Sequence, residues 1–187
     1  MTPDKVSFEL LVDSISYKGE PKPSNFEMGA IRNRLASPSA RMHMNIHELE
    51  QAIRDGLTLM PGICIGGTRL KNWTAQQLFL LDFDNDEAML TSFGKILEPL
   101  DALRRAIDLK LDPLFLYFTA KATAEPWNPR FRLVFALDKP IHDRSGAEHI
   151  SLSLLNQFPE ADGSSGQLNR MFLCPGGEVW PCWTLIY

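Results

Sequence analysis

Two aspartates, Asp82 and Asp84, stand two positions apart at the end of an apolar run, LFLLDFD, over residues 78–84. If this run is a strand, both side chains point to the same face, and their Cα atoms lie about 6.5 Å apart. Carboxylates at about that distance repel each other by roughly 3 kcal/mol at an effective dielectric constant of about 20, and a divalent cation would offset the repulsion. Mg²⁺ and Mn²⁺ take oxygen ligands of this kind. The spacing therefore predicts a metal site, with a strand that simply ends in solvent-exposed aspartates as the alternative.

The strands that would position this pair are indicated by the apolar patterns along the chain. The run at residues 78–84 is apolar at nearly every position and indicates a central strand covered on both faces. Further strands are expected at residues 6–16, 114–119, 131–137 and 169–174.

Helices are predicted between these strands from capping signals. Asn45 with Glu48 predicts a helix that begins with a capping box, and Gly56 would end it. A later helix, running to about residue 158, begins at one of these polar residues: Asp143, or Ser145 with Glu148. Strands interspersed with helices indicate an α+β or α/β domain.

The composition fits one globular domain with a sizeable core. The chain has 187 residues, 44% of them hydrophobic and 22% charged. It has no apolar run of the roughly 20 residues that span a bilayer and no signal-peptide pattern, and its three cysteines suit a reducing compartment, so we expect a cytoplasmic protein without a membrane partner. The net charge of −4 gives no overall attraction to nucleic acid, so any such function needs a local basic patch.

Three segments in order resemble one known family. LLDFDND, YFTAKATAEPWNPRFRLVFALDKPI and FPEADGSSGQLNRMF together resemble the primase-polymerase branch of the archaeo-eukaryotic primase superfamily, over about residues 55–175. The family's first motif, an hhhDhD strand, is matched by residues 80–84, and its third, a hydrophobic residue followed by an acid, by Leu137 and Asp138. Because these acids bind the catalytic metals in the family, the resemblance implies that Asp82, Asp84 and Asp138 hold Mg²⁺ or Mn²⁺ in a two-metal site.

The family's second motif is altered in this chain. It is a Ser-x-His or a close variant in the family, and the corresponding TAKAT at residues 119–123 has neither serine nor histidine. The resemblance implies nucleotide or phosphate contacts for Thr119, Lys121 and Thr123, with Lys121 acting as a point charge. It also implies phosphate contacts for Arg132 and Arg170, whose guanidinium groups suit bidentate binding. Weaker contacts to nucleic acid are expected for Arg69, Asn72 and Arg130.

The resemblance implies a fold and a function together. The fold would be a single α+β domain with an RRM-like, mainly antiparallel sheet, an N-terminal αβ lobe over about residues 1–75 and a motif-bearing lobe over about 76–187. The function would be template-directed nucleotidyl transfer from NTP or dNTP on a DNA template, as in DNA primases and polymerases of phages, plasmids and other mobile elements. A helicase or accessory replication domain would be a partner.

Three alternatives to this function stay open. A degenerate primase-type domain could bind DNA or nucleotide without catalysis, which the altered second motif favours. Another metal-dependent phosphotransferase or nuclease could use the same carboxylates. An interaction domain with no active site would leave the aspartates as exposed turn residues.

Several other residues are candidates with a plainer structural interpretation. Asp162 is a rival third metal ligand, although the Gly-Ser-Ser that follows it indicates a loop. No zinc site is expected, because the spacing of the potential ligands fits no standard site: His43, His47, Cys174 and Cys182. The glycines at positions 62, 66 and 67 lack the lysine of a P-loop and indicate a structural turn. A loose basic stretch, either a solvated surface or a contact to a nucleic-acid backbone, comprises Arg32, Arg34 and Arg41.

Overall fold

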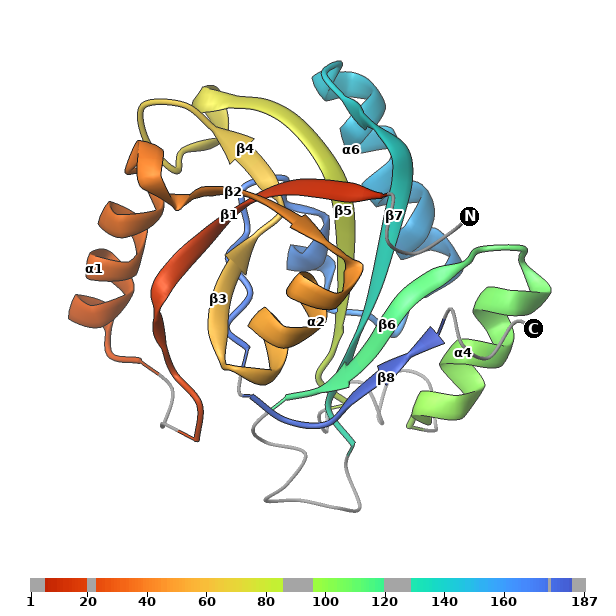
Figure 1. Cartoon of the computed structure of the whole chain (residues 1–187). Coiled ribbons are helices and arrows are strands. Elements are labelled where there is room, and N and C mark those ends of the chain that lie inside the picture. Colours follow the sequence, from red (N-terminus) through yellow and green to blue (C-terminus); the bar gives the residue numbers. More distant parts are fainter. Residues whose placement is uncertain (1–5, 20–22, 86–95, 120–128, 175, 183–187) are drawn as a thin grey trace.

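The chain folds into two antiparallel sheets and, within the described residues, four α-helices (Figure 1). The computed structural model describes residues 6–19, 23–85, 96–119, 129–174 and 176–182. This mixed architecture confirms the α+β class, whereas the RRM-like sheet stays a prediction. The elements in chain order are β1 (Ser7–Ser16), α1 (Asn25–Leu35), η2 (Pro38–Ala40), β2 (Arg41–Asn45), α2 (Ile46–Arg54), β3 (Leu57–Met60), β4 (Gly62–Cys64), η3 (Leu70–Asn72), β5 (Trp73–Phe83), α4 (Pro99–Asp108), β6 (Pro113–Phe118), β7 (Phe131–Ile141), α6 (Arg144–Gln157), η4 (Gly163–Gly166) and β8 (Val179–Pro181).

The first sheet has the strand order β2-β1-β3, and α2 connects its two outer strands. The predicted capping box of α2 is confirmed: Asn45 Oδ1 accepts hydrogen bonds from the backbone N–H groups of His47 and Glu48, and the Glu48 carboxylate accepts from Asn45 N. The helix ends just before Gly56, whose φ of 76° is a left-handed conformation that glycine adopts without strain. Local sequence signals therefore set both ends of this helix.

Removing the N-cap of α2 should cost measurable stability. We expect Asn45→Ala to lower the free energy of unfolding by about 1 kcal/mol, because two backbone donors lose their acceptor. Asn45→Asp keeps a side-chain oxygen in place and should stay close to the wild type. Urea unfolding followed by circular dichroism measures both variants, and an equal loss in the two would contradict the capping role.

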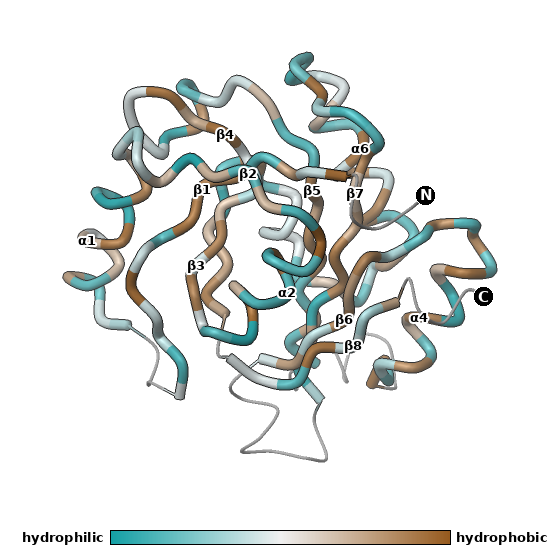
Figure 2. Tube along the Cα trace, viewed as in Figure 1, coloured by the Kyte–Doolittle hydropathy of each residue, from teal (hydrophilic) through white to brown (hydrophobic). Residues whose placement is uncertain are grey.

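The second sheet has the strand order β4-β5-β7-β6-β8 and carries the predicted central strand. Side chains of β5 alternate between two buried clusters: Phe79, Leu81 and Phe83 pack with residues of α6 and α4, whereas Leu78 and Leu80 pack with residues of α2 and the first sheet. Figure 2 shows the resulting apolar character along β5 and β7. Burial on both faces explains why this strand has no polar alternation.

An aromatic stack anchors the end of β5 on the face that α6 covers. The ring of Phe83 lies 4.6 Å from that of its cross-strand partner Phe131 and meets Phe158 edge-on at 6.0 Å. Phe158 follows α6, which begins, as one of the two alternatives predicted, after an N-cap at Asp143 that accepts from Gly146 N. The stack fixes the backbone of β5 at the position from which Asp82 and Asp84 project.

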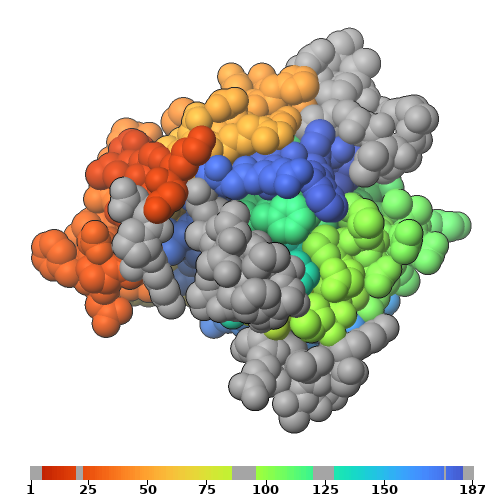
Figure 3. Space-filling view, turned by 90° about the horizontal axis from the view of Figure 1, so that it is seen from below, coloured from red at the N-terminus to blue at the C-terminus, as the bar shows by residue number. Residues whose placement is uncertain are grey.

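The prediction of a last strand at residues 169–174 is wrong. This segment, which the structure describes throughout, makes a single bridge to β3, in which Phe172 and Leu59 exchange two backbone hydrogen bonds of 2.9 and 2.7 Å. The next carbonyl, that of Leu173, accepts from the side chain of Arg132 instead of from a neighbouring strand. The last described strand is β8, which pairs with β6 and whose Val179 carbonyl accepts from Arg54 of α2. Figure 3 shows this blue part of the chain between the orange segment that includes α2 and the green region that includes α4.

The two sheets share buried side chains. Phe8 and Leu10 of β1 belong to the same apolar cluster as Leu78 and Leu80 of β5. The strands of the first sheet end at Met60, and the predicted division into lobes near residue 75 stays a prediction. Among the described residues, no helix combines the length and apolar character needed to cross a membrane. Three free cysteines, Cys64, Cys174 and Cys182, are buried.

Candidate functional site

Asp82 lies at the end of β5 on the face that points toward the first sheet. Its side chain continues the row of Leu78 and Leu80, and the residue is only 4% exposed. The antiparallel register places Arg132 of β7 directly opposite it, and Tyr117 of β6 opposite Arg132. Three neighbouring strands thus contribute one polar residue each to a single cross-strand row.

Arg132 is the buried centre of this row. Its Nε donates to Asp82 Oδ1 at 2.9 Å and its Nη2 to Asp82 Oδ2 at 3.1 Å, a bidentate pair. Its Nη1 donates to the Tyr117 hydroxyl at 3.3 Å and to the Leu173 carbonyl at 2.5 Å. The guanidinium carbon also lies 5.3 Å from the centre of the Phe172 ring. The full set of partners explains how a charged side chain is stable at this depth.

The surroundings of this row keep Arg132 protonated and the Tyr117 hydroxyl neutral. Burial is the largest single effect and lowers the pKa of Arg132. The charge of Asp82, its hydrogen bonds with Arg132 and the nearby Tyr117 together raise the pKa by more, so that it lies well above its usual value. Burial raises the pKa of the Tyr117 phenol well above its usual value, so its hydroxyl is neutral near pH 7. Arg132 therefore acts as a fixed cation that holds the Asp82 carboxylate in one orientation.

A second guanidinium, that of Arg170, reaches the same carboxylate from the chain that follows α6. Its Nη2 donates to Asp82 Oδ2 at 2.9 Å, and its Nη1 donates to Asp162 Oδ2 at 2.8 Å. The backbone of Asp82 is held as well, since its carbonyl accepts from Asp162 N at 2.7 Å and its N–H donates to Ser165 Oγ at 3.0 Å. Asp162, predicted only as a rival ligand, therefore lies beside Asp82.

Asp162 is held in its ionised form by the turn that it caps. Burial raises its pKa, but hydrogen bonds from the backbone and hydroxyl of Ser164 and the charge of Arg170 lower the pKa below its usual value. Its carboxylate accepts from Ser164 N at 2.9 Å at the start of η4. The Gly-Ser-Ser sequence thus forms the predicted loop and at the same time presents Asp162 to Arg170.

Asp84 forms the outer, more exposed part of the site. Its side chain is 44% exposed, and its Oδ1 accepts from Arg130 Nη1 at 2.9 Å. Arg130 itself is mostly buried, and its Nε has no hydrogen-bond partner among the described residues. The next residue, Asn85, adopts a left-handed φ of 45° and donates through its side chain to the carbonyls of Leu97 and Pro129. We call the six charged residues of this site the aspartate–arginine cluster: Asp82, Asp84, Asp162, Arg130, Arg132 and Arg170.

The prediction that Asp138 joins Asp82 and Asp84 is wrong. Arg132 lies opposite Asp82, whereas Asp138 falls between Ala136, which pairs with Leu78, and Ile141, which pairs with Gln76. Asp138 is therefore displaced from Asp82 by four to six residues of β5, or about 13–20 Å at the rise of a strand. The strand does not end at Leu137 as predicted but continues to Ile141, so Asp138 is an exposed residue at the opposite end of β7. An ion bound at Asp82 could not reach it.

The aspartate–arginine cluster is electrically balanced as it stands, with three carboxylates and three guanidinium groups. Among the described residues, no group of three or more His, Cys, Asp or Glu side chains is arranged to hold a metal ion. The carboxylates of Asp82 and Asp84 are of the ligand type that a divalent ion takes when its remaining ligands come from substrate phosphates and water, which is how Mg²⁺ is commonly bound. Binding of such an ion requires Arg170 to leave Asp82 Oδ2. The Mg²⁺ or Mn²⁺ cofactor stays a prediction.

The other residues predicted to contact nucleotide or nucleic acid lie in several different parts of the chain. Thr119 continues the pairing of β6 with β7, since its N–H donates to the Arg130 carbonyl at 3.0 Å. Lys121 and Thr123 lie outside the described residues. Asn72 donates through its side chain to the carbonyls at positions 66 and 67 and therefore stabilises the glycine-containing loop. Arg69, the N-cap residue of η3, is exposed.

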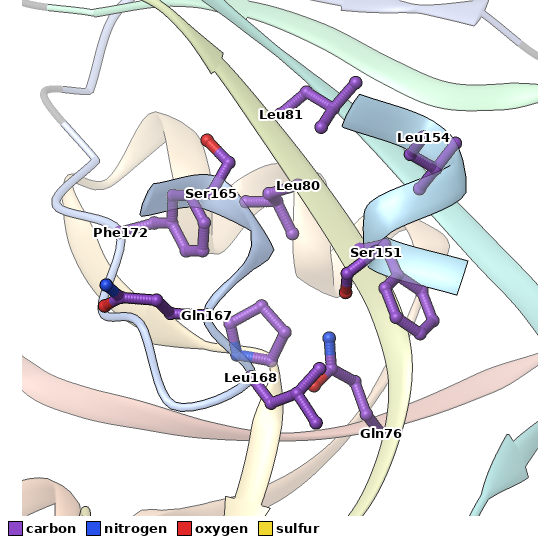
Figure 4. Close-up of a pocket in the computed structure, with 11 residues that line it drawn as sticks. Gln76, Leu80, Leu81, Ser151, Leu154, Ser165, Gln167, Leu168 and Phe172 are labelled. Atoms are coloured by element: carbon purple, nitrogen blue, oxygen red, sulfur yellow. The ribbon is translucent and has the colours of Figure 1, made fainter. Parts of the chain in front are cut away.

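A small cavity lies beneath η4, between β5 and α6 (Figure 4). Its volume is about 10 Å³, which is enough for one water molecule and too small for a substrate. The labelled side chains of Gln76, Ser151 and Ser165 give it a partly polar lining. We therefore regard this cavity as part of the packing behind the cluster.

Comparisons with known proteins assign no family to the chain. No protein-family model matches it, and neither a curated protein nor a solved structure does. The motif resemblance therefore rests on the residues of this chain alone, and the function is inferred from the geometry of the aspartate–arginine cluster.

Proposed function

We propose that this chain is a primase-polymerase-type domain that performs metal-dependent, template-directed nucleotidyl transfer in DNA replication. The observation that carries the proposal is the meeting of Asp82 and Asp84 with three arginines at one end of β5. Carboxylates suit divalent cations, and guanidinium groups suit phosphates, so one site has ligands for both parts of a metal–nucleotide substrate. The resemblance of the DFD strand and of the later arginines to the primase motifs supports the same function.

The two arginines of Asp82 have separate roles in this proposal. Arg132 is buried and donates to both oxygens of Asp82 and to the Leu173 carbonyl, so it orients the Asp82 carboxylate and stays in place. Arg170 binds through its two terminal nitrogens to two different carboxylates, and phosphate oxygens offer the same bidentate geometry. A bound nucleotide would thus take over Arg170 and leave Asp82 Oδ2 with the bond from Arg132 Nη2 alone. A divalent metal, when bound, supplies Lewis-acid stabilisation of the phosphoryl charge.

Primer synthesis and extension test this function. The assay uses a single-stranded DNA template with NTPs or dNTPs and either Mg²⁺ or Mn²⁺. We expect Asp84→Asn to reduce product formation by at least about 100-fold, comparable to the loss of one electrostatic stabiliser of a transition state. Asp84 is the variant of choice because its carboxylate is partly exposed, so the fold should tolerate the change.

A matched control shows whether a loss of activity comes from the charge of Asp84 or from the loss of any exposed aspartate. Asp101→Asn removes one exposed aspartate from α4 and should leave activity unchanged. Equal activity in the wild type and the Asp84→Asn variant would exclude the metal site, and so would equal losses in Asp84→Asn and Asp101→Asn. Cleavage of the DNA without release of pyrophosphate would indicate a nuclease.

A second candidate function is nucleotide or DNA binding without catalysis by a degenerate domain of the same type. It is favoured by the geometry of Asp82, both of whose carboxylate oxygens accept from arginines, and by the distance of Asp138. Titration with Mn²⁺ in the presence of nucleotide separates the two functions. Binding of nucleotide without uptake of Mn²⁺ or formation of product would support the binding function.

A further inference from the structure

A groove opens beside the aspartate–arginine cluster, between α1 and the chain that follows η4. Its volume is about 280 Å³, at the small end of the range for ligand sites in proteins. It has two basic residues and no acidic residue in its lining, which comprises Met28, Arg32, Thr68, Ser164, Gln167, Asn169, Arg170 and Met171. Arg170 belongs to both the groove and the cluster, so an occupant of the groove would lie next to Asp82.

One wall of the groove is held together by a hydrogen bond between two segments of the chain. Asn169 Nδ2 donates to the Thr68 carbonyl at 3.0 Å and so connects the loop before β5 with the chain that follows η4. On the opposite wall, Met28 and Arg32 are four residues apart on α1 and therefore share one face of the helix. The groove is consequently present without any rearrangement of these elements.

Arg32 is the available cation of the groove. The sequence has a basic stretch here, but Arg34 is bound to the buried Asp13 through two hydrogen bonds of 2.6 and 2.7 Å, and Arg41 is paired with Glu9. Arg32 is exposed and makes no ion pair with any described residue. Only this member of the stretch is therefore free to attract an anion.

The charge of the groove suits an anion of low charge. Arg170 is already neutralised by two carboxylates, those of Asp82 and Asp162, so Arg32 adds roughly one unit of net positive charge. A phosphodiester linkage carries one negative charge, and a nucleoside triphosphate carries several. The charge balance thus favours the backbone of a nucleic-acid strand over a free triphosphate.

Neutral groups in the groove fit the same occupant. The Gln167 amide and the Thr68 hydroxyl make no hydrogen bond with the described residues, so they are available to phosphate and sugar oxygens. Met28 and Met171 add apolar surface that adapts to a sugar or a base. Polar donors beside flexible apolar side chains are typical of contacts to single strands without sequence preference.

We propose that this groove binds the phosphodiester backbone of single-stranded DNA, with one linkage held by Arg32, while Arg170 stays with the aspartate–arginine cluster. The groove brings the strand to the edge of the aspartate–arginine cluster. Its role in delivering a template or primer rests on the proposed nucleotidyl transfer, whereas binding of the strand does not. The two can therefore be tested apart.

Binding is measured by fluorescence anisotropy of a labelled single-stranded oligonucleotide, over a series of salt concentrations and without metal or nucleotide. We expect Arg32→Ala to weaken binding several-fold and to reduce the slope of log K against log salt by about 0.7, the value for one phosphate contact on a single strand. Arg32→Glu should weaken binding further. The matched control is Arg104→Ala on α4, on the other side of the molecule in Figure 1, which should change neither affinity nor slope.

Each outcome decides the proposal. If Arg32→Ala binds the oligonucleotide as tightly as Arg104→Ala does, the groove is not the strand site. If Arg32→Ala weakens binding of dATP by the same factor as binding of the oligonucleotide, the groove takes a free nucleotide and the strand proposal fails. The binding assay contains no metal, so a loss of primer extension in the Asp84→Asn variant does not change the result expected for strand binding. Likewise, a failure of Arg32→Ala to weaken strand binding would not exclude nucleotidyl transfer at the aspartate–arginine cluster.

Discussion

Replacing Arg132 with methionine should destabilise the protein by about 3–5 kcal/mol, because a buried carboxylate would lose its main counter-ion. Asp82 is 4% exposed, and Arg132 supplies two of the three side-chain hydrogen bonds that its carboxylate accepts. The same change also removes the donor of the Leu173 carbonyl and leaves the Tyr117 hydroxyl with only the weak donor Cys174 Sγ. Urea denaturation followed by tryptophan fluorescence measures the loss.

Two comparisons attribute this loss to the buried charge. Arg144→Met removes an exposed arginine that pairs with Glu148 on the same helix, and it should cost about 0.5 kcal/mol or less. Adding Asp82→Asn to Arg132→Met neutralises the stranded carboxylate and should recover part of the stability. A double variant as unstable as the sum of the two single changes would show that the ion pair does not determine the cost.

Replacing Gly62 with alanine is expected to cost about 3 kcal/mol, because the added methyl group has no room. A Cβ atom at this position in β4 would lie 1.9 Å from the Leu168 carbonyl oxygen and 3.0 Å from Trp73 Cδ1. Backbone cannot move aside as a flexible side chain does, so the chain after η4 would have to shift. That chain forms one wall of the groove, and we therefore expect the variant to lose affinity for single-stranded DNA as well as stability.

Gly29→Ala is the matched control for this change. Gly29 lies in α1, where an added Cβ would meet nothing within 4 Å, and its φ is in the ordinary range. Alanine in a helix is more favourable than glycine, so this variant should gain about 0.5–1 kcal/mol. If Gly62→Ala unfolds at the same urea concentration as the wild type, the close approach of Leu168 does not constrain this position.

Features that depend on neighbouring residues could be predicted from the sequence. The capping box of Asn45 and Glu48 and the apolar strand at residues 78–84 are local patterns, and the structure has both. The spacing of Asp82 and Asp84 predicts that both side chains point to one face, because the two-residue period of a strand is a property of its backbone, and their sharing of one metal site stays a prediction. The basic stretch was visible as well, but not which of its arginines is free.

Features that depend on strand register and on long-range pairing came only from the tertiary structure. Asp138 is twenty-four residues before Asp162 in the chain, and the primase motifs favoured it as the third metal ligand. The antiparallel register of β5 with β7 nevertheless places Asp138 at the far end of the sheet. Asp162 reaches Asp82 because the chain after α6 folds back over the end of β5. Tyr117 joins the row through the pairing of β6 with β7. No local pattern encodes such contacts, since a shift of one residue in register reverses which side chains face each other.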